Sequence, residues 1–433
     1  MGHKTSLLVL FCEGTQALEQ ARQLLDDSLR TIYAYDIITL GKDDIQRLIL
    51  AQDSQKALRD AIFNQTLDLT LVSPFTVVGP VSEDMFRGRE GEIRFITQMV
   101  KNKPVAVLGG RRIGKTSVLQ KVRRLLSKPT SDYRCVYLDL TPAWNYGDLF
   151  KVIAIDCECP EVSALDANPI NFMDVVGILR DDKPLLFIMD EIDALLRFDT
   201  KNDELLFKTF RSLSQKGACR FIFSGEKCVS ERLRNSGSPF FNFCESIPLG
   251  YLDTRSARKL ITGPMALMNI ELLDPDGIVQ EIIDLSSCHP RIIQLICQRL
   301  IEEINKEKVR HISYEHLQRV SRDWDFQDQY VDSVWSSATS LERIITLLLN
   351  DAGATLPEIE AALRKAELPY TTTELDTALS NLEMYSILKR VERLYCFVPK
   401  RFPEIVRECM DIDREIEKCK REVQSEKNWK SRL

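Results

Sequence analysis

Residues Val105 to Thr116 read VAVLGGRRIGKT, an apolar run followed directly by a glycine-rich turn. The part from Gly109 to Thr116 fits the pattern G-x-x-x-x-G-K-[ST]. Glycines let such a turn direct backbone N–H groups around phosphates, and the helix that follows adds the positive end of its dipole. A glycine turn can also arise by chance, but here an apolar strand precedes the motif and helical spacing follows it. The stretch therefore predicts a phosphate loop that binds ATP or ADP.

The polar positions of this loop have distinct expected roles. The Lys115 ammonium can reach the β- and γ-phosphates, and the Thr116 hydroxyl can ligate Mg²⁺. We therefore expect Lys115 to act in catalysis as well as in binding. The expected nucleotide contacts in the loop are Gly109, Gly110, Arg111, Arg112, Ile113, Gly114, Lys115, Thr116 and Ser117.

A second acidic motif follows a buried strand. Residues 185 to 191 read LLFIMDE, and ligands bind at the carboxyl ends of such strands in parallel sheets. Asp190 is expected to hold Mg²⁺ directly or through water, and Glu191 to accept a proton from the attacking water. Asp190 could instead only cap the next helix, but the phosphate loop favours the metal role. Asp193 is better explained as a charge at a helix N-terminus.

A third strand, residues 220 to 225, reads RFIFSG and ends in a polar residue. Ser224 is placed to contact the γ-phosphate or the water, which is the sensor-1 role in ATPases of this class. A simple cap at the end of the strand explains the same serine equally well. We include Ser224 among the expected catalytic residues and leave both interpretations open.

The pattern along the chain predicts an α/β protein of several domains. Continuous apolar strands alternate with helices from residue 86 onward, which indicates a parallel sheet covered on both faces. After Leu252 only helices follow, and then three helices and a hairpin, which is a winged-helix pattern. The last segment reads as a mixed-charge, solvated helix. The expected parts are a small α/β module (1–70), a linker (71–84), a P-loop ATPase core (85–250), a helical lid (251–325), a winged-helix domain (326–408) and a charged C-terminal helix (409–433).

Composition adds few constraints. A net charge of −6 and a pI near 5.6 give no global attraction to nucleic acid or anionic lipid. No stretch approaches the roughly 18 apolar residues of a membrane span, so we expect no membrane contact. The twelve cysteines are scattered without metal-ligand spacing, which is typical of reduced thiols in a cytoplasmic protein.

Four segments resemble a known group of ATPases. Residues 85 to 93 (MFRGREGEI) are similar to the F-x-G-R-E-x-E-I box of STAND NTPases and of origin-recognition and loader ATPases. The loop GGRRIGKTSVL resembles the same group's G-x-R-R-x-G-K-T-S-L. Residues 238 to 252 resemble the stretch leading into the STAND lid, and residues 288 to 297 (CHPRIIQLIC) resemble its lid box, GGHPRLIQLLC. The chain thus resembles a compact bacterial STAND-type P-loop NTPase of the AAA+ and origin-recognition-like group, over residues 85 to 400.

This resemblance implies further site residues. Met85 and Phe86 would line the adenine pocket, Gly88 and Arg89 would lie beside the nucleotide, and Pro290 would pack on the base. The lid box departs from the family pattern, because Ser287 and Cys288 replace its paired glycines. That departure puts the shape of the adenine pocket in doubt. No arginine is clearly a finger for a neighbouring subunit, since Arg232 and Arg234 are equally well explained as surface residues.

The resemblance also implies a molecular switch. Nucleotide held between the core and the lid would control lid position, and a trigger would let the protein open and form a homo-oligomer. Many bacterial members act in antiviral defence with an effector ahead of the ATPase. Residues 1 to 70 occupy that place and could contact a protein partner, but they lack a D…E-x-K arrangement, so a catalytic effector is not expected.

A second reading is a DNA-handling ATPase of the loader or transposition-regulator type. Its winged helix would bind duplex DNA, but the expected reading helix, residues 371 to 384, carries three acidic residues and no Lys or Arg. We therefore favour the switch and expect any DNA binding to be weak. The basic residues that leave wing contacts open are Lys389, Arg390, Arg393, Lys400 and Arg401.

Overall fold

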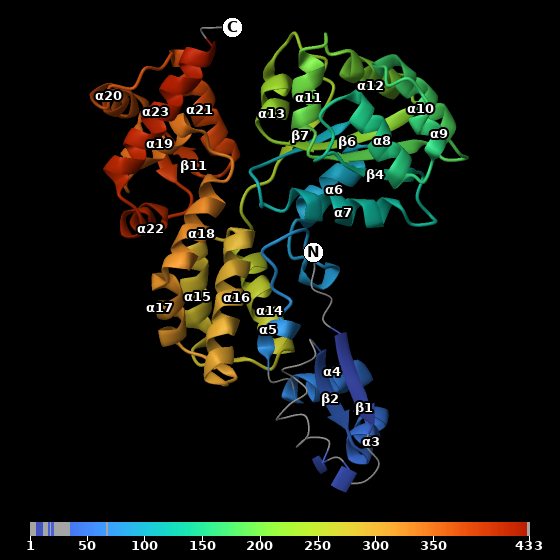
Figure 1. The fold of residues 1–433 in the computed structure, drawn as a ribbon, viewed down its shortest axis with the longest axis vertical. Coiled ribbons are helices and arrows are strands. Elements are labelled where there is room, and N and C mark those ends of the chain that lie inside the picture. The colour runs from blue at the N-terminus through green and yellow to red at the C-terminus, as the bar shows by residue number, and fades with distance from the viewer. Residues whose placement is uncertain (1–5, 12–15, 18, 21–34, 66–67, 431–433) are drawn as a thin grey trace. The chain divides into compact units, whose positions relative to one another are not determined.

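The structure is a computed structural model that describes residues 6–11, 16–17, 19–20, 35–65 and 68–430. The chain forms two compact units (Figure 1). Unit 1 comprises Met1–Gly79 and Asp253–Gln329, and unit 2 comprises Pro80–Leu252 and Tyr330–Leu433. Each unit is described by itself. Within the α/β module predicted for residues 1–70, most of the stretch from 12 to 34 falls outside the described residues.

Unit 2 is built on a five-stranded parallel sheet with strand order β4-β5-β6-β3-β7. Strands β3 and β5 are buried along their whole length, as their continuous apolar sequences require. The α/β fold with a parallel sheet is therefore confirmed. The strands are β3 (Val105–Leu108), β4 (Arg134–Asp139), β5 (Leu185–Asp190), β6 (Cys219–Gly225) and β7 (Glu245–Pro248).

Helices cover both faces of this sheet with separate apolar cores. One face packs against α6 (Glu90–Met99) and α7 (Lys115–Leu126). The other core is rich in aromatic rings, with Phe187, Phe221 and Phe223 stacked across the strands. The helices contributing to it are α8 (Tyr146–Asp156), α9 (Pro160–Ser163), α10 (Phe172–Leu179), α11 (Asp193–Thr200), α12 (Leu205–Gln215) and α13 (Lys227–Arg234), with the single turn η3 (Pro169–Asn171).

The C-terminal region of unit 2 combines helices with a small antiparallel sheet of order β10-β12-β11. The three helices and the hairpin lie where the sequence predicts them, and the third strand, β10, was not predicted. Helix α18 (Trp324–Trp335) is divided between the units, with residues up to Gln329 in unit 1 and from Tyr330 onward in unit 2. The other helices of the region are α19 (Ser340–Leu348), α20 (Leu356–Lys365), α21 (Thr372–Met384), α22 (Phe402–Cys409) and α23 (Ile412–Lys430). The strands are β10 (Ala354–Thr355), β11 (Leu388–Val391) and β12 (Leu394–Phe397).

The last helix corrects one expectation. The mixed charge of α23 predicts a solvated helix, but α23 packs along α19. Cys419 and Val423 lie four residues apart on one face and are buried there. The prediction holds for the charged positions, most of which are exposed, but it missed one face. Ile412, Ile416, Cys419 and Val423 are spaced as a single helical stripe, and the surrounding charges hid it.

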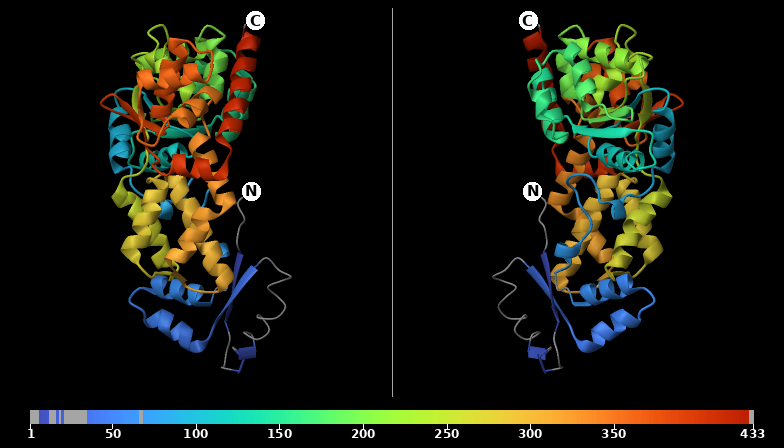
Figure 2. Two further views of the ribbon diagram at one scale, coloured as in Figure 1. Left: turned by 90° about the vertical axis from the view of Figure 1, so that its left-hand side faces the viewer. Right: turned by 90° about the vertical axis from the view of Figure 1, so that its right-hand side faces the viewer.

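Unit 1 contains a set of packed helices and two parallel strand pairs. Helices α14 (Thr254–Leu267), α15 (Pro275–Ser286), α16 (Pro290–Glu307) and α17 (Tyr314–Arg322) pack together, beside the short strands β8 (Glu271–Leu272) and β9 (His311–Ile312). Strands β1 (Ser6–Phe11) and β2 (Tyr35–Leu40) pair in parallel, with α3 (Lys42–Leu50) and α4 (Ser54–Gln65) beside them (Figure 2).

The segment that follows α4 is held to the helices of unit 1. Its short helix α5 (Leu69–Val72) packs on α16, and Leu69 N donates to Asn305 Oδ1 at 2.8 Å. Thr76 N donates to Gln294 Oε1 at 3.2 Å. Leu69 at the end of the predicted module and Thr76 in the predicted linker therefore both make specific contacts with α16. Among the described residues, no helix has the length and apolarity to cross a membrane.

Candidate nucleotide-binding site

The phosphate loop connects the end of β3 to the start of α7, as the motif requires. Gly114 has φ +99°, a conformation that residues with a side chain rarely adopt, and it turns the chain into the helix. Gly109 lies against the segment after β7, where an added Cβ would come within 2.9 Å of Leu249 O. Glycine is therefore needed at both ends of the loop for different reasons.

Lys115 is the first residue of α7, and its side chain folds back under the loop. Its buried ammonium donates to Gly109 O at 3.0 Å and to Gly110 O at 3.1 Å. Two carboxylates also approach it, Glu226 Oε1 at 3.2 Å and Glu191 Oε1 at 3.5 Å. Burial lowers the pKa of Lys115, but the two carboxylates more than offset this, so the pKa is raised. The lysine is therefore a fixed positive charge in the loop.

Asp190, Glu191 and Ser224 come together at the carboxyl ends of β5 and β6. The buried Ser224 hydroxyl donates to Asp190 Oδ1 and accepts the Glu191 N–H at 3.0 Å. The other Asp190 oxygen, Oδ2, accepts from the Tyr137 hydroxyl at 3.0 Å. Burial, followed by the negative charge of Asp190, raises the pKa of Tyr137. Two hydroxyl donors thus fix the orientation of the Asp190 carboxylate.

Tyr137 was missed by the sequence reasoning. It lies on β4 beside β5, so parallel pairing of the two strands was the signal available. The alternation of side chains then places Tyr137 on the face that carries α7. Its ring also receives the Arg123 guanidinium of α7 at 5.5 Å.

Glu191 is the more exposed of the two acidic residues in the motif. Burial raises its pKa, and the Lys115 charge opposes that rise only in part. A raised carboxylate pKa suits a group that must accept a proton. The role of Glu191 as the proton acceptor stays a prediction.

Asp193 begins α11, which agrees with its expected place at a helix N-terminus. Its carboxylate, however, also serves a second helix. It accepts the backbone N–H groups of Glu226 at 2.7 Å and Cys228 at 2.9 Å, at the start of α13. Asp193 therefore fixes the turn between β6 and α13 and leaves the phosphate loop to other residues.

The donors available for Mg²⁺ are Asp190 and Thr116. Mg²⁺ beside a nucleotide usually binds one or two carboxylates, the phosphates and several waters. Among the described residues there is no cluster of three or more His, Cys, Asp or Glu that could hold a metal ion. An oriented aspartate and a threonine in the first turn of α7 fit a metal that is held together with ATP.

The residues assigned to the adenine pocket lie in both units. In unit 2, Met85 is buried at the end of η2 (Glu83–Met85), and Phe86 packs against the core under α6 and α7. Arg89 has φ +70° at the start of α6, and its guanidinium donates to Gly250 O. Pro290 begins α16 of unit 1. The contacts of these residues with adenine stay a prediction.

Two assigned loop arginines bind the C-terminal region of unit 2. Arg111 N donates to Ser337 Oγ at 3.2 Å, and Arg112 Nη1 pairs with Asp332 Oδ2 at 2.7 Å. The partners are 226 and 220 residues apart in sequence, so no local pattern could reveal them. Ser117, also assigned to the nucleotide, accepts the Val81 N–H at 3.2 Å.

A second buried ion cluster lies where α13 meets the C-terminal region. Glu342 of α19 accepts from Lys227 Nζ at 2.8 Å, Asn381 Nδ2 at 2.9 Å and Thr339 N at 2.7 Å. The Lys227 ammonium also lies 5.4 Å from the centre of the Tyr385 ring. Tyr385 in turn lies against the phosphate loop, since a Cβ added to Gly110 would come within 3.4 Å of it.

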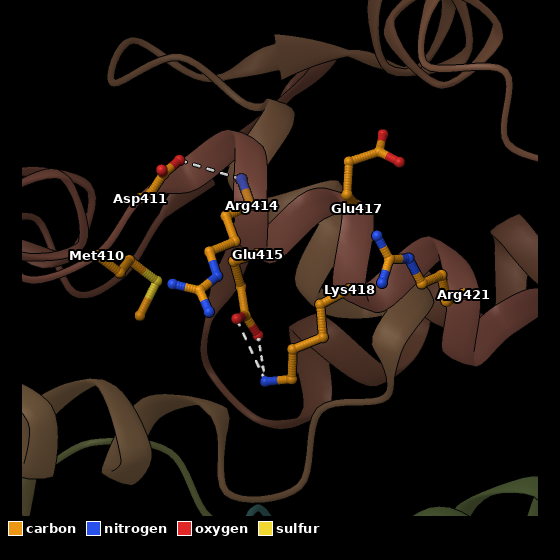
Figure 3. Close-up of a pocket in the computed structure, with 7 residues that line it drawn as sticks. All are labelled: Met410, Asp411, Arg414, Glu415, Glu417, Lys418 and Arg421. Atoms are coloured by element: carbon orange, nitrogen blue, oxygen red, sulfur yellow. Dashed lines mark hydrogen bonds and ion pairs between the residues drawn. The ribbon is translucent and has the colours of Figure 1, made fainter.

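The remaining candidates are accounted for by local pairing. Arg232 Nη1 forms an ion pair with Glu204 Oε1 at 3.4 Å, and Arg234 bonds Ser230 on its own helix. A cleft on α23 has mixed charges that pair along that helix, such as Lys418 with Glu415 at 3.1 Å (Figure 3). It contains none of the phosphate-loop residues and offers no convergent set of polar groups.

Comparison with known proteins gives the fold a context. No protein-family model and no curated protein sequence matches this chain. The Walker-type ATPase PABY2304 of Pyrococcus abyssi matches with a TM-score of 0.57 at 14% identity, covering 77% of this chain and 99% of that chain. The Aeropyrum pernix ORC2 protein, solved as ADPNP-ADP complexes, matches with a TM-score of 0.55 at 15% identity, covering 79% and 96%. The chain thus has the fold of these P-loop ATPases.

Proposed function

We propose that this chain binds ATP with Mg²⁺ and hydrolyses it at the phosphate loop. The observation that carries this proposal is the meeting of Lys115, Asp190, Glu191 and Ser224 at one edge of the parallel sheet. A buried ammonium under a glycine loop suits phosphates, and an oriented carboxylate suits a metal ion. A separate carboxylate with a raised pKa suits proton abstraction.

Each residue has a role in the proposed reaction. Lys115 holds the β- and γ-phosphates and offsets negative charge as the γ-phosphoryl group transfers. Glu191 orients the attacking water and accepts its proton. Tyr137 and Ser224 fix the orientation of the Asp190 carboxylate, which would hold Mg²⁺. Mg²⁺, held by Asp190 and Thr116, would neutralise phosphate charge when bound.

Replacing Lys115 tests the site directly. Lys115→Ala removes the buried ammonium of the loop, and we expect ATP and ADP binding to be lost in titration calorimetry. Lys128→Ala, at an exposed lysine just after the same helix, is the matched control and should bind like the parent protein. Undiminished binding by a folded Lys115→Ala protein would place the nucleotide elsewhere.

We also propose that the ATPase works as a STAND-like molecular switch, in which nucleotide state controls lid position and assembly. Support comes from the path of the chain out of β7. Leu249 N donates to Leu108 O at 2.7 Å, Leu249 O lies against Gly109, and Gly250 O accepts from Arg89. The chain then enters unit 1 at Asp253. A change at the loop can therefore reach the segment that leads to the lid.

A nucleotide shifts such an equilibrium only by its differential affinity for the two states. Moving a population from 1:99 to 99:1 needs roughly 5.5 kcal/mol, which the γ-phosphate and its metal ion can supply. The test is assembly size by light scattering, with ADP and with ATP in the Glu191→Gln protein. A larger assembly with ATP than with ADP supports the switch, acting through a homo-oligomer. The N-terminal module would then contact a protein partner, as in antiviral defence. Identical size and identical core-to-lid distances in both states would leave a constitutive ATPase.

A DNA-handling ATPase is the second candidate, and the β11–β12 hairpin favours it. If the C-terminal region is a winged helix, Lys389, Arg390 and Arg393 form an exposed basic wing. Helix α21 disfavours tight DNA binding, because its last residue, Met384, packs on the aromatic core of the ATPase sheet and is not free to enter a groove. Charge reversal of Lys389 and Arg390 should lower weak, salt-sensitive DNA binding, while Glu374→Ala should not. Tight, sequence-specific binding lost on changing residues 371 to 373 would favour the DNA-handling candidate.

A further inference from the structure

Glu226 has an unusual position for a residue beside a phosphate site. It directly follows β6, and its backbone N–H is held by Asp193, so the turn fixes where the side chain starts. The side chain is only 13% exposed, and Oε1 lies 3.2 Å from Lys115 Nζ and 3.8 Å from Arg111 Nε. The other oxygen, Oε2, accepts from Ser337 Oγ at 2.9 Å. Both carboxylate oxygens are therefore engaged by the loop or by the C-terminal region.

The proposed hydrolysis gives Glu226 no task. Glu191 already supplies the base and Asp190 the metal ligand, whereas Glu226 adds a third negative charge next to a site for polyanions. The Glu226 carboxylate and a bound phosphate would repel each other strongly in this partly buried site. The Lys115 ammonium has three protons, and Gly109 O, Gly110 O and Glu226 Oε1 accept them. A phosphate oxygen must displace one of these acceptors.

We propose that Glu226 is a built-in competitor for the nucleotide phosphates at Lys115 and thereby sets nucleotide affinity. Of the three acceptors, the two carbonyls belong to the loop backbone, while the Glu226 carboxylate sits on a side chain that can rotate. Binding exchanges a lysine–carboxylate contact for a lysine–phosphate contact. Glu226 is thus an affinity-setting residue that acts through Lys115. This inference rests on the proposed nucleotide-binding function.

The same contact links affinity to the C-terminal region. Ser337 holds Glu226 Oε2 and also accepts the Arg111 N–H of the phosphate loop. When a phosphate binds Lys115 in place of Glu226, the Glu226 carboxylate still has Ser337 and Arg111 as partners. The position of the competitor therefore depends on a residue from the segment between α18 and α19. Nucleotide affinity is then sensitive to how that segment lies on the loop.

The experiment measures ATP, ADP and AMP affinity by competition with a fluorescent ADP. Glu226→Gln keeps the shape and the hydrogen-bonding capacity but removes the charge, and Glu226→Ala removes the competitor entirely. Because hydrogen bonds to charged groups are the strong ones, losing the competing carboxylate should matter. We expect the Kd of ATP and of ADP to fall by roughly 10-fold or more in both variants. AMP has neither a β- nor a γ-phosphate for Lys115, so its affinity should not change. Glu231→Gln, an exposed glutamate on α13, loses the same charge and should match the parent.

Each outcome decides between the two proposals. If Glu226→Gln binds ADP and ATP with the same affinity as the parent and Glu231→Gln, the proposed competition by Glu226 is overturned. The proposed ATPase function is not affected by that result. Weaker binding by a variant with unchanged thermal unfolding also overturns it, because Glu226 would then assist nucleotide binding. An equal gain for AMP would assign the effect to general electrostatics and overturn the role at Lys115. Failure of the parent and all variants to bind any nucleotide overturns the proposed function itself.

Discussion

Two ion clusters in unit 2 bury charge in different ways. Around Lys115, the ammonium is 3% exposed, but its two carboxylate partners come from separate strand ends, and Glu191 is 35% exposed. Around Glu342, the carboxylate is 2% exposed and receives donors from Lys227, Asn381 and the Thr339 backbone. The partners of the Lys115 ammonium can therefore be replaced by a ligand, whereas the Glu342 carboxylate is fully enclosed by its donors.

The difference separates a binding site from a structural joint. A buried charge with a competing ligand must be able to release its present partner, and both carboxylates at Lys115 lie on side chains that are more exposed than the Glu342 carboxylate. A fully enclosed carboxylate with matched donors cannot change partners without leaving a buried group unsatisfied. Variants at the first cluster should therefore alter nucleotide chemistry, and variants at the second should alter stability.

The largest expected effect is at Glu191. Glu191→Gln retains the shape and can still orient water, but it cannot accept a proton. We expect ATP to bind and persist while the hydrolysis rate falls about 10²- to 10⁴-fold, measured by phosphate release. Glu231→Gln is the control and should hydrolyse at the parental rate. Parental hydrolysis by Glu191→Gln would remove this residue from the mechanism and leave its carboxylate as a mere partner of Lys115.

A smaller effect is expected at Tyr137. Tyr137→Phe removes one of the two hydroxyls that orient Asp190, and partners of metal ligands typically contribute about 10- to 100-fold to metal affinity. The Mg²⁺ concentration needed for half-maximal hydrolysis should rise by that order, while the rate at saturating Mg²⁺ is retained. Tyr133→Phe, at a tyrosine just before β4, is the matched control. An unchanged Mg²⁺ requirement in Tyr137→Phe would show that Ser224 alone fixes the carboxylate.

The third prediction sharpens the comparison at Glu342. Glu342→Ala leaves the Lys227 ammonium and the Asn381 amide without their shared acceptor, which we expect to lower the free energy of unfolding by about 1–2 kcal/mol. Denaturant unfolding measures that loss, and titration calorimetry should find an unchanged ADP affinity in the folded protein. Glu226→Gln should show the reverse pattern. A Glu342→Ala protein with full stability and altered ADP affinity would erase the distinction between the two clusters.

The sequence was sufficient for the sheet and the phosphate loop. The strands β3 and β5 are continuous apolar runs, and each ends in a motif whose chemistry constrains its surroundings. The sequence was insufficient for α18, where the buried Phe326, Tyr330 and Val334 are interspersed with acidic and amide residues that mask the helical period. For α23 the signal was present but weak, because the stripe formed by Ile412, Ile416, Cys419 and Val423 is surrounded by charged residues.

The site divides in the same manner. Lys115, Asp190 and Glu191 belong to local motifs and could be named from spacing alone. Tyr137 and Glu226 could not, because strand pairing places the first and the turn into α13 places the second. The contacts of Ser337 and Glu342 with the core join residues 111 and 115 positions apart, and such pairings are set by tertiary packing.

The enclosure of Glu342 also bears on how the protein folds. Its donors come from α13 of the ATPase core and from α21 of the C-terminal region, so neither part alone can satisfy the carboxylate. Opening one part exposes polar groups and apolar surface belonging to the other, which joins the two into one cooperative folding unit. Lys227 and Glu342, which are 115 residues apart in the sequence, are therefore expected to share a single unfolding transition.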